Sequence, residues 1–134
     1  MPVLISGTSN QPLAEKVGKL LGMPLHPVDI RRFSDGEIYV ELETTVRGEE
    51  IFLLQSTSAG QDDSVNDHLM ELILMISACR RASAQSITAV IPYYGYARSD
   101  RLSKKRTTIA AADVAKILVA SRFNLFLEPQ HSCY

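Results

Sequence analysis

The chain has 134 residues, of which 46% are hydrophobic and 22% charged, and its formal net charge is −1. This length suits one compact domain, and the balanced charge gives no reason to expect binding to nucleic acid or to a membrane surface. The sequence has no apolar run near the roughly 20 residues of a membrane helix, no basic segment typical of a signal peptide, and no cysteine pattern typical of disulfides or zinc. These features predict a globular, cytoplasmic protein.

The first segments alternate a short apolar run with an amphipathic helix. Residues 3–5 (VLI) are typical of a buried strand. Asn10 and Pro12 suit the N-cap and first turn of a helix, and Gly22 suits its end. Residues 25–30 predict a second short strand.

The next two strands differ in their hydrophobic pattern. Residues 37–43 alternate with period two, so that Ile38, Val40 and Leu42 share one face. This pattern predicts a half-buried strand that lies as an antiparallel flap or edge. Residues 51–54 (IFLL) are continuously apolar, which is typical of a strand covered on both faces.

The second half of the chain repeats the alternation. Ser64 and Asp67 have the spacing of a capping box and begin a helix with an apolar stripe that reaches Cys79. Three further segments are a buried strand at 87–91, a helix from Thr107 to Leu118 and an apolar stretch at 123–127. Strands alternating with helices predict an α/β domain with a parallel sheet flanked by helices.

Ligands of α/β sheets bind near the carboxyl ends of strands, and residues 32–37 (RFSDGE) lie between two predicted strands. Phe33 is able to stack on an adenine ring, and Asp35 or Glu37 is able to accept a hydrogen bond from the exocyclic amine. The same residues also fit a simple turn around Asp-Gly with solvated acids. Residue types alone leave both interpretations open.

Two other polar segments also follow strands. The hydroxyl groups of residues 55–58 (QSTS) either bind phosphate or cap their own loop. Residues 92–106 contain five cationic residues and three tyrosines. Clustered Arg and Lys suit a polyphosphate. Tyrosines among cations also suit stacking on nucleic-acid bases, which the balanced total charge disfavours.

The remaining reactive residue types form no recognisable catalytic arrangement. His26 and His68 are expected at the surface, and His131 has no metal-ligand spacing with another residue. Cys79 falls on the apolar stripe of its helix and is expected in the core. A P-loop pattern is absent, and the catalytic residues remain unknown.

Several motifs in a fixed order carry a family resemblance: RFSDGE at 32–37, VRG at 46–48, QST at 55–57, NDHLMEL at 66–72, RRASA at 80–84, ITAVIPYYGYAR at 87–98 and DR at 100–101. Over residues 1–121 the chain resembles the N-terminal domain of ribose-phosphate pyrophosphokinase, or phosphoribosyl pyrophosphate (PRPP) synthetase. The resemblance implies a phosphoribosyltransferase-like fold. It also implies a kinase of nucleotide biosynthesis that transfers the diphosphoryl group of ATP to ribose 5-phosphate, giving PRPP and AMP.

The resemblance also implies a cofactor, partners and site residues. The cofactor is Mg²⁺, and subunits pair into dimers or hexamers with ATP bound across an interface. ATP binding is assigned to Phe33, Asp35 and Glu37 of one subunit and to Arg98, Ser99 and Asp100 of a neighbour. Arg47 corresponds to part of an allosteric phosphate site, and His131 lies near the position of the family's metal-binding histidine. Ser99 departs from the family, which usually has Gln there.

The resemblance ends after residue 121, so residues 122–134 are expected to form a divergent tail. The family's second domain, which holds most of the ribose 5-phosphate site, has no counterpart here. We therefore expect this chain to be incomplete for catalysis. The alternatives are a non-catalytic paralogue that binds nucleotide or assembles with full-length subunits, and a nucleic-acid binder that uses the basic loop.

Overall fold

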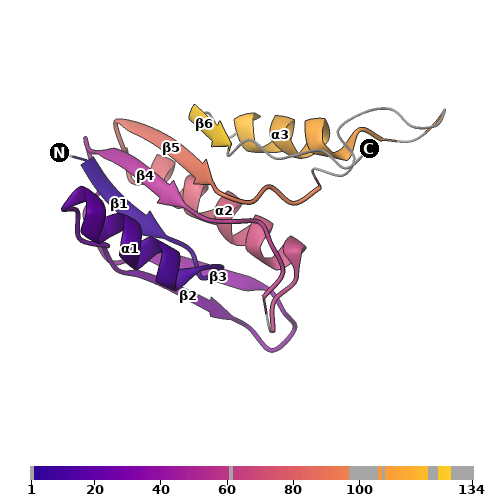
Figure 1. The fold of residues 1–134 in the computed structure, drawn as a ribbon, viewed down its shortest axis with the longest axis horizontal. Coiled ribbons are helices and arrows are strands. Elements are labelled where there is room, and N and C mark those ends of the chain that lie inside the picture. Colours follow the sequence, from indigo (N-terminus) through magenta and orange to yellow (C-terminus); the bar gives the residue numbers. More distant parts are fainter. Residues whose placement is uncertain (1, 61, 97–105, 107, 121–123, 128–134) are drawn as a thin grey trace.

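A computed structural model describes residues 2–60, 62–96, 106, 108–120 and 124–127. The elements are β1 (Pro2–Ser6), α1 (Gln11–Leu21), β2 (Val28–Arg32), β3 (Ile38–Leu42), β4 (Glu50–Leu54), α2 (Val65–Arg81), β5 (Ser86–Ile91), α3 (Ala110–Ala120) and β6 (Asn124–Leu127). The parallel sheet has the strand order β1-β4-β5-β6, and β2 pairs with β3 in a separate antiparallel sheet (Figure 1). The predicted α/β class with an antiparallel flap is confirmed.

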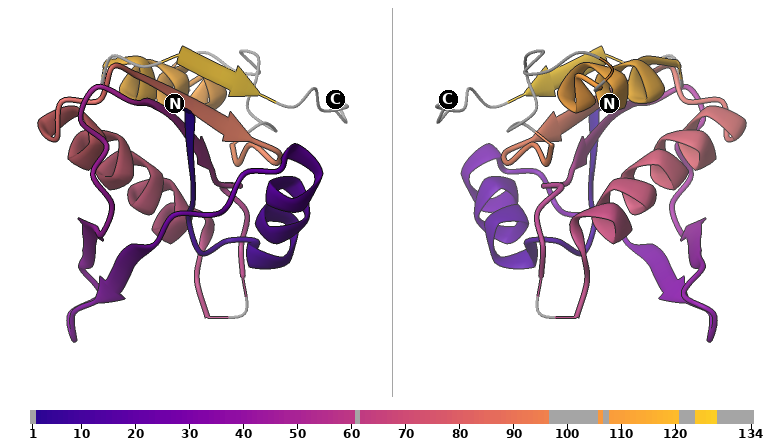
Figure 2. Two further views of the ribbon diagram at one scale, coloured as in Figure 1. Left: turned by 90° about the vertical axis from the view of Figure 1, so that its left-hand side faces the viewer. Right: turned by 90° about the vertical axis from the view of Figure 1, so that its right-hand side faces the viewer.

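Helices cover the two faces of the parallel sheet (Figure 2). On one face, alternate strand residues such as Ile5 and Leu53 pack with α2 and α3 in the larger core cluster. On the other face, Leu4 and Leu54 pack with Ala14 of α1. The continuously apolar β4 is therefore covered on both sides, as its sequence predicts.

The helix ends follow the predicted capping signals. The Asn10 side chain accepts a hydrogen bond from Leu13 N at 3.2 Å, and Gly22 ends α1 with a φ of +66°. Ser64 and Asp67 form the reciprocal bonds of a capping box at the start of α2. In the part of the chain that the structure describes, each helix is too short or too polar to cross a lipid bilayer.

The β2–β3 hairpin lies against α2 rather than in the parallel sheet. Its partly buried apolar residues pack on the larger core cluster: Val28, Ile30, Val40 and Leu42. The predicted strand at 25–30 begins only at Val28, and Leu25 forms an isolated bridge with Leu4. Pro27 accounts for part of this difference, because proline has no N–H to donate to a strand ladder.

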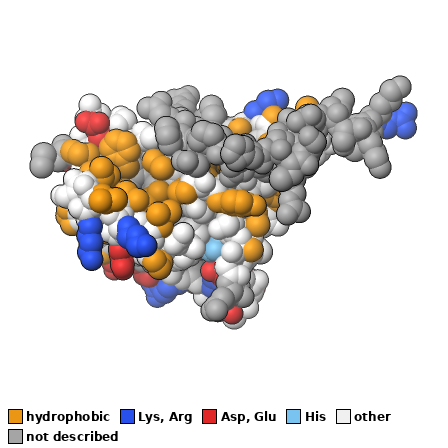
Figure 3. Space-filling model, viewed as in Figure 1, with side chains coloured by type: hydrophobic (Ala, Val, Ile, Leu, Met, Phe, Trp, Pro, Cys, Tyr) orange, Lys and Arg blue, Asp and Glu red, His pale blue; other side chains and the backbone are white. Residues whose placement is uncertain are grey.

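The α1 side of the sheet retains an apolar hollow of about 280 Å³. Its lining consists of hydrophobic side chains from α1, from three strands and from the segment after α1: Pro2, Leu4, Val17, Leu21, Met23, Phe52, Leu54 and Val90. Figure 3 shows hydrophobic side chains gathered on this side, over β1 and β4. Here α1 covers only part of the sheet face.

Candidate nucleotide site and buried polar cluster

The hairpin tip, residues 33–37, closes as a tight turn. Phe33 N donates to Glu37 O at 2.8 Å, and Gly36 N donates to Phe33 O at 2.9 Å. Asp35 Oδ1 accepts from Glu37 N at 3.0 Å, so the aspartate shapes the loop in the manner of an Asx turn. Gly36 adopts a φ of +93°, which an L side chain rarely does. The Asp-Gly turn is confirmed, and its acids are exposed.

An exposed aromatic ring stands at this tip. Phe33 is 55% exposed, and its ring packs edge to face with that of Tyr39, with 5.9 Å between the ring centroids. The Arg31 guanidinium lies 5.1 Å from the Tyr39 ring centre. With Arg32, these residues line a hollow of about 350 Å³. The arrangement offers a flat apolar surface beside cations, which suits a planar ring attached to an anionic group.

The hydroxyl of Tyr39 is held on the outer face of the hairpin. It donates to Glu41 Oε2 at 2.7 Å, and this hydrogen bond raises the pKa of Tyr39. Tyr39 therefore stays protonated near neutral pH and supports the position of the Phe33 ring through its edge contact. The tip is thus braced by side chains of both strands.

The other residues assigned through the resemblance do not meet Phe33 within the described part of the chain. Arg47 is exposed in the turn that follows β3, at the end of that strand away from the tip. Arg98, Ser99, Asp100 and His131 lie outside the described residues. Their predicted roles consequently remain predictions.

The segment 55–57 forms hydrogen bonds with neighbouring loops. Gln55, Ser56 and Thr57 are all buried. Gln55 Oε1 accepts from Ser9 Oγ at 2.8 Å, and Ser56 N donates to Ser9 Oγ at 3.0 Å. Thr57 Oγ1 accepts from Gly95 N at 2.6 Å. These groups are used within the protein, which favours a structural role over phosphate binding, although their partners lie in neighbouring loops and not in the segment's own loop.

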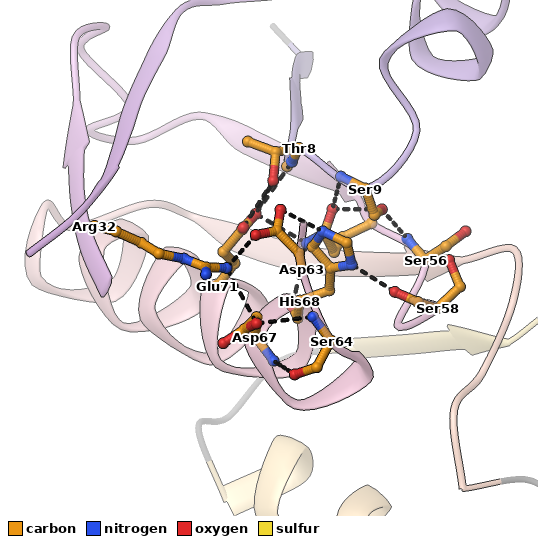
Figure 4. A network of polar contacts seen from close by, with 12 residues as sticks. Thr8, Ser9, Arg32, Ser56, Ser58, Asp63, Ser64, Asp67, His68 and Glu71 are labelled. Atoms are coloured by element: carbon orange, nitrogen blue, oxygen red, sulfur yellow. Dashed lines mark hydrogen bonds and ion pairs between the residues drawn. The ribbon is translucent and has the colours of Figure 1, made fainter. Parts of the chain in front are cut away.

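A buried carboxylate joins the ends of β1 and β4 to α2 (Figure 4). Glu71 is only 3% exposed. It accepts from Thr8 N at 3.1 Å, from Thr8 Oγ1 at 2.9 and 2.7 Å, and from Gln55 Nε2 at 3.1 Å. Glu71 was not among the functional residues predicted from the sequence. The available signal was a carboxylate directly beside Leu72 on the apolar stripe of α2.

His68 also lies in this cluster, and the prediction that it is exposed was wrong. It is 1% exposed, because Ser58 and Asp63, which precede α2 in the sequence, lie against its ring. Its Nδ1 lies 2.5 Å from Ser58 O, and its Nε2 lies 3.3 Å from Asp63 Oδ2. His26, in contrast, has intermediate exposure.

Arg32 connects the base of the hairpin tip to this cluster. Its Nη2 pairs with Asp63 Oδ1 and lies 3.2 Å from Asp67 Oδ2. The backbone hydrogen bond from Ser64 is the main cause of the lowered pKa of Asp67, and Arg32 adds to it. The residue directly before Phe33 is therefore tied to α2 and to the loop that precedes it.

Cys79 is buried in the core, as predicted. Desolvation raises the pKa of its thiol to about 12. Because the thiolate is the reactive form of cysteine, this thiol is unsuited to nucleophilic chemistry.

Among the described residues, Asp63, His68 and Glu71 form a group in which one ligand atom of each lies within 4.8 Å of the others. Mg²⁺ prefers oxygen ligands and keeps several waters. A buried imidazole between carboxylates does not fit that preference, so we assign no step of a magnesium-dependent reaction to this group. The predicted magnesium ligand, His131, is outside the described residues.

Comparison with known proteins gives one consistent family. A family model for the N-terminal domain of ribose phosphate pyrophosphokinase matches residues 2–121. Ribose-phosphate pyrophosphokinase from Parasynechococcus marenigrum is 52% identical over 118 residues, which cover 88% of this chain and 34% of that protein. Putative ribose-phosphate pyrophosphokinase 2 from Streptococcus pyogenes is 51% identical over 115 residues, covering 86% of this chain and 34% of that protein.

A solved structure agrees with these relatives. The crystal structure of phosphoribosylpyrophosphate synthetase from Mycobacterium smegmatis matches with a TM-score of 0.87 and 35% identity. The match covers 94% of this chain and 41% of that one. The chain thus spans about a third of the length of the curated relatives named above.

Proposed function

The chain belongs to the ribose-phosphate pyrophosphokinase family, and we propose that it supplies the adenine-binding part of a site at which ATP donates its diphosphoryl group to ribose 5-phosphate. The observation that carries this proposal is the exposed Phe33 on a braced hairpin tip. An exposed aromatic ring gains apolar contact when it stacks on a base, and because Phe33 is not part of the core, no packing is given up.

The acids of the tip complement this ring. Asp35 and Glu37 are exposed beside Phe33, and both side chains are hydrogen-bond acceptors. An exocyclic amine of a purine is a donor, so the pair suits adenine. The bond from Glu37 N to Asp35 Oδ1 orients the Asp35 carboxylate before a ligand arrives. Such preorganisation lowers the entropic cost of binding.

The remaining parts of the proposed reaction come from the resemblance. Arg98, Ser99 and Asp100 of a neighbouring copy would contact ATP, so that the site forms across an interface between subunits. Bound Mg²⁺ would neutralise phosphate charge, and His131 is the residue proposed for it. Residues 1–121 would act as the nucleotide-binding domain and 122–134 as a divergent tail, in a cytoplasmic enzyme of nucleotide biosynthesis.

Calorimetric titration with ATP tests the adenine assignment. Phe33→Ala should weaken binding by about 1–2 kcal/mol, because stacking and apolar contact are lost. Leu20→Ala is a matched control, since Leu20 is an exposed hydrophobic residue on α1. Unchanged titration curves for both Phe33→Ala and Asp35→Ala would reject the proposed site.

A second candidate function, for the 134 residues by themselves, is nucleotide binding without catalysis; these residues span about a third of the relatives' length. Positioning catalysis requires both substrates to be held together. We therefore expect the 134-residue chain alone to release little or no AMP from ATP and ribose 5-phosphate. Turnover comparable to that of a full-length relative would exclude the non-catalytic candidate.

Sedimentation and titration together test the proposed interface. We expect self-association at micromolar concentration, and Arg98→Ala should reduce ATP affinity while the assembly persists. A clean monomer would contradict the shared site. Loss of assembly and of ATP affinity together would make Arg98 a structural residue.

Arg47 has a separate proposed role in binding a regulatory phosphate. Its exposed position after β3, away from the hairpin tip, is compatible with a second anion site. Arg47→Ala should weaken the response to inorganic phosphate without changing ATP titration of the tip. Equal losses of affinity for inorganic phosphate and for ATP would argue against a separate phosphate site.

A further inference from the structure

The imidazole of His68 has one satisfied and one unsatisfied nitrogen. Ser58 O is a carbonyl and only accepts, so the Nδ1 that lies 2.5 Å from it carries the hydrogen. Nε2 is buried and makes no hydrogen bond within the described residues. Buried nitrogen atoms without a partner are costly, so this atom calls for an explanation.

The group that faces Nε2 is another acceptor. Asp63 Oδ2 lies 3.3 Å away, without the geometry of a hydrogen bond. The loop turn holds Asp63 there, since Gly60 N donates to Asp63 O at 2.8 Å. When Nε2 has no hydrogen, two lone-pair atoms face each other at short range. Such an arrangement is stabilised by a cation between them.

The charge of the surroundings also favours a cation. Three carboxylates (Asp63, Asp67 and Glu71) and one guanidinium (Arg32) meet in this region. With neutral imidazole, three negative charges and one positive charge leave a net charge of −2. A divalent ion would neutralise this excess beside His68 and Glu71, which are buried and where unpaired charge is expensive.

Glu71 retains capacity for one more interaction. Its carboxylate has about four lone-pair sites. Three hydrogens approach it, from Thr8 N, Thr8 Oγ1 and Gln55 Nε2. One site is therefore left for a metal without breaking the bonds that hold β1 and β4 to α2.

We propose that Asp63, His68 and Glu71 bind a divalent transition metal of the Zn²⁺ class, with water in the remaining position. The mixed nitrogen and oxygen donors suit Zn²⁺ better than Mg²⁺. A histidine that donates its other ring N–H to a backbone carbonyl is the usual arrangement of a metal ligand.

The distances between the three ligand atoms need to shorten only slightly for a metal to bind. Ligand atoms of the group lie within 4.8 Å of one another. Ligands about 2.1 Å from a tetrahedral Zn²⁺ lie roughly 3.4 Å apart. Asp63 is on a surface loop, with a partly exposed side chain, so it is the ligand that would move. Figure 4 shows its carboxylate and the His68 ring directed toward each other.

The metal would also connect two parts of the fold. Asp63 pairs with Arg32, and Arg32 directly precedes Phe33. A metal on Asp63 and His68 would therefore fix Asp63 between α2 and the hairpin. This inference is independent of the proposed nucleotide function, because it concerns the residues below the tip and not the tip itself.

Calorimetric titration of chelator-treated chain with Zn²⁺ tests the proposal. The background carries His131→Asn and Cys133→Ser, which remove donor groups near the C-terminus. We expect one Zn²⁺ per chain, a higher midpoint of thermal unfolding, and no comparable effect of Mg²⁺. His68→Asn and Asp63→Asn should each weaken Zn²⁺ binding more than about tenfold, whereas His26→Asn should not.

Two results would overturn the proposal: no stoichiometric uptake of Zn²⁺, or equal affinity in the background chain, His68→Asn and Asp63→Asn. If His68→Asn lacks a cooperative unfolding transition, the Zn²⁺ affinity of Asp63→Asn is used to decide between the outcomes. Asp63 lies in a loop, so its substitution leaves the core intact. The ¹⁵N chemical shift of His68 Nε2 gives a direct reading. If the chemical shift changes when Zn²⁺ is added, the metal site is supported. If the shift is that of a protonated nitrogen and Zn²⁺ does not change it, the metal site is refuted.

Discussion

The hairpin tip and the buried cluster around Glu71 both place polar residues beside strand ends, but they use them in opposite ways. At the tip, Phe33 and its neighbouring acids are exposed, and one oxygen of Asp35 is used to shape the turn. In the cluster, Glu71 and Gln55 are buried, and their hydrogen bonds to each other and to residues 8 and 9 join three segments of the chain. Side chains of the tip are available for a ligand, whereas those of the cluster mainly hold loops together.

The largest expected effect comes from breaking the cluster. Glu71→Ala removes the acceptor for Thr8 and Gln55 and leaves their buried donors unpaired. We expect a loss of about 3 kcal/mol or more in the free energy of unfolding. Urea unfolding in the presence of a chelator measures it. The exposed Glu43→Ala is the control, with an expected change within about 0.5 kcal/mol. Similar losses for the two variants would contradict the comparison.

A smaller effect is expected from crowding the cluster. A Cβ at Gly7 would lie 2.2 Å from Gln55 Oε1, so Gly7→Ala must displace the Gln55 side chain. We expect a loss of about 2 kcal/mol in urea unfolding. At the tip, a Cβ on Gly36 meets no atom within 4 Å, and only its φ of +93° is unfavourable. Gly36→Ala should lower the free energy of unfolding by about 1 kcal/mol. A larger loss for Gly36→Ala than for Gly7→Ala would contradict the expected order.

Acid should weaken the connection between the two regions. The folded chain lowers the pKa of Asp67 below its ordinary value of 3.8. Its carboxylate therefore contributes stability above about pH 4, and this contribution is lost as the pH falls through the lowered pKa. Asp67→Asn should narrow the difference in unfolding free energy between pH 6 and pH 3. An unchanged difference would show that Asp67 does not contribute to acid sensitivity.

The smallest effect on stability is expected at the exposed ring. Phe33→Ala should change the free energy of unfolding by no more than about 0.5 kcal/mol, because the ring lies outside the core. The same variant should bind ATP more weakly, as proposed above. A loss of stability near that of Glu71→Ala would mean that Phe33 has a structural role.

Local patterns in the sequence correctly predicted most of the fold. The caps at Asn10 and Ser64 depend on residues at most three positions away, and the structure forms both. The period-two pattern at 37–43 predicted a half-buried flap, and β3 is such a strand. The Asp-Gly sequence at residues 35–36 likewise predicted the turn at Asp35. These features need only neighbouring residues, so their signals are complete in a short segment.

The tertiary structure alone decided which polar residues are buried. His68 falls in the first turn of an amphipathic helix, and nothing nearby in the sequence shows that Ser58 and Asp63 lie against its ring. Glu71 bonds to Thr8, which is 63 positions away, and Ser9 bonds to Gln55, which is 46 positions away. The sequence alone determined the helices, strands and turns through local hydrogen bonding and periodicity. Burial and charge pairing depend on contacts between distant segments, and these exist only once the sheet has brought β1, β4 and α2 together.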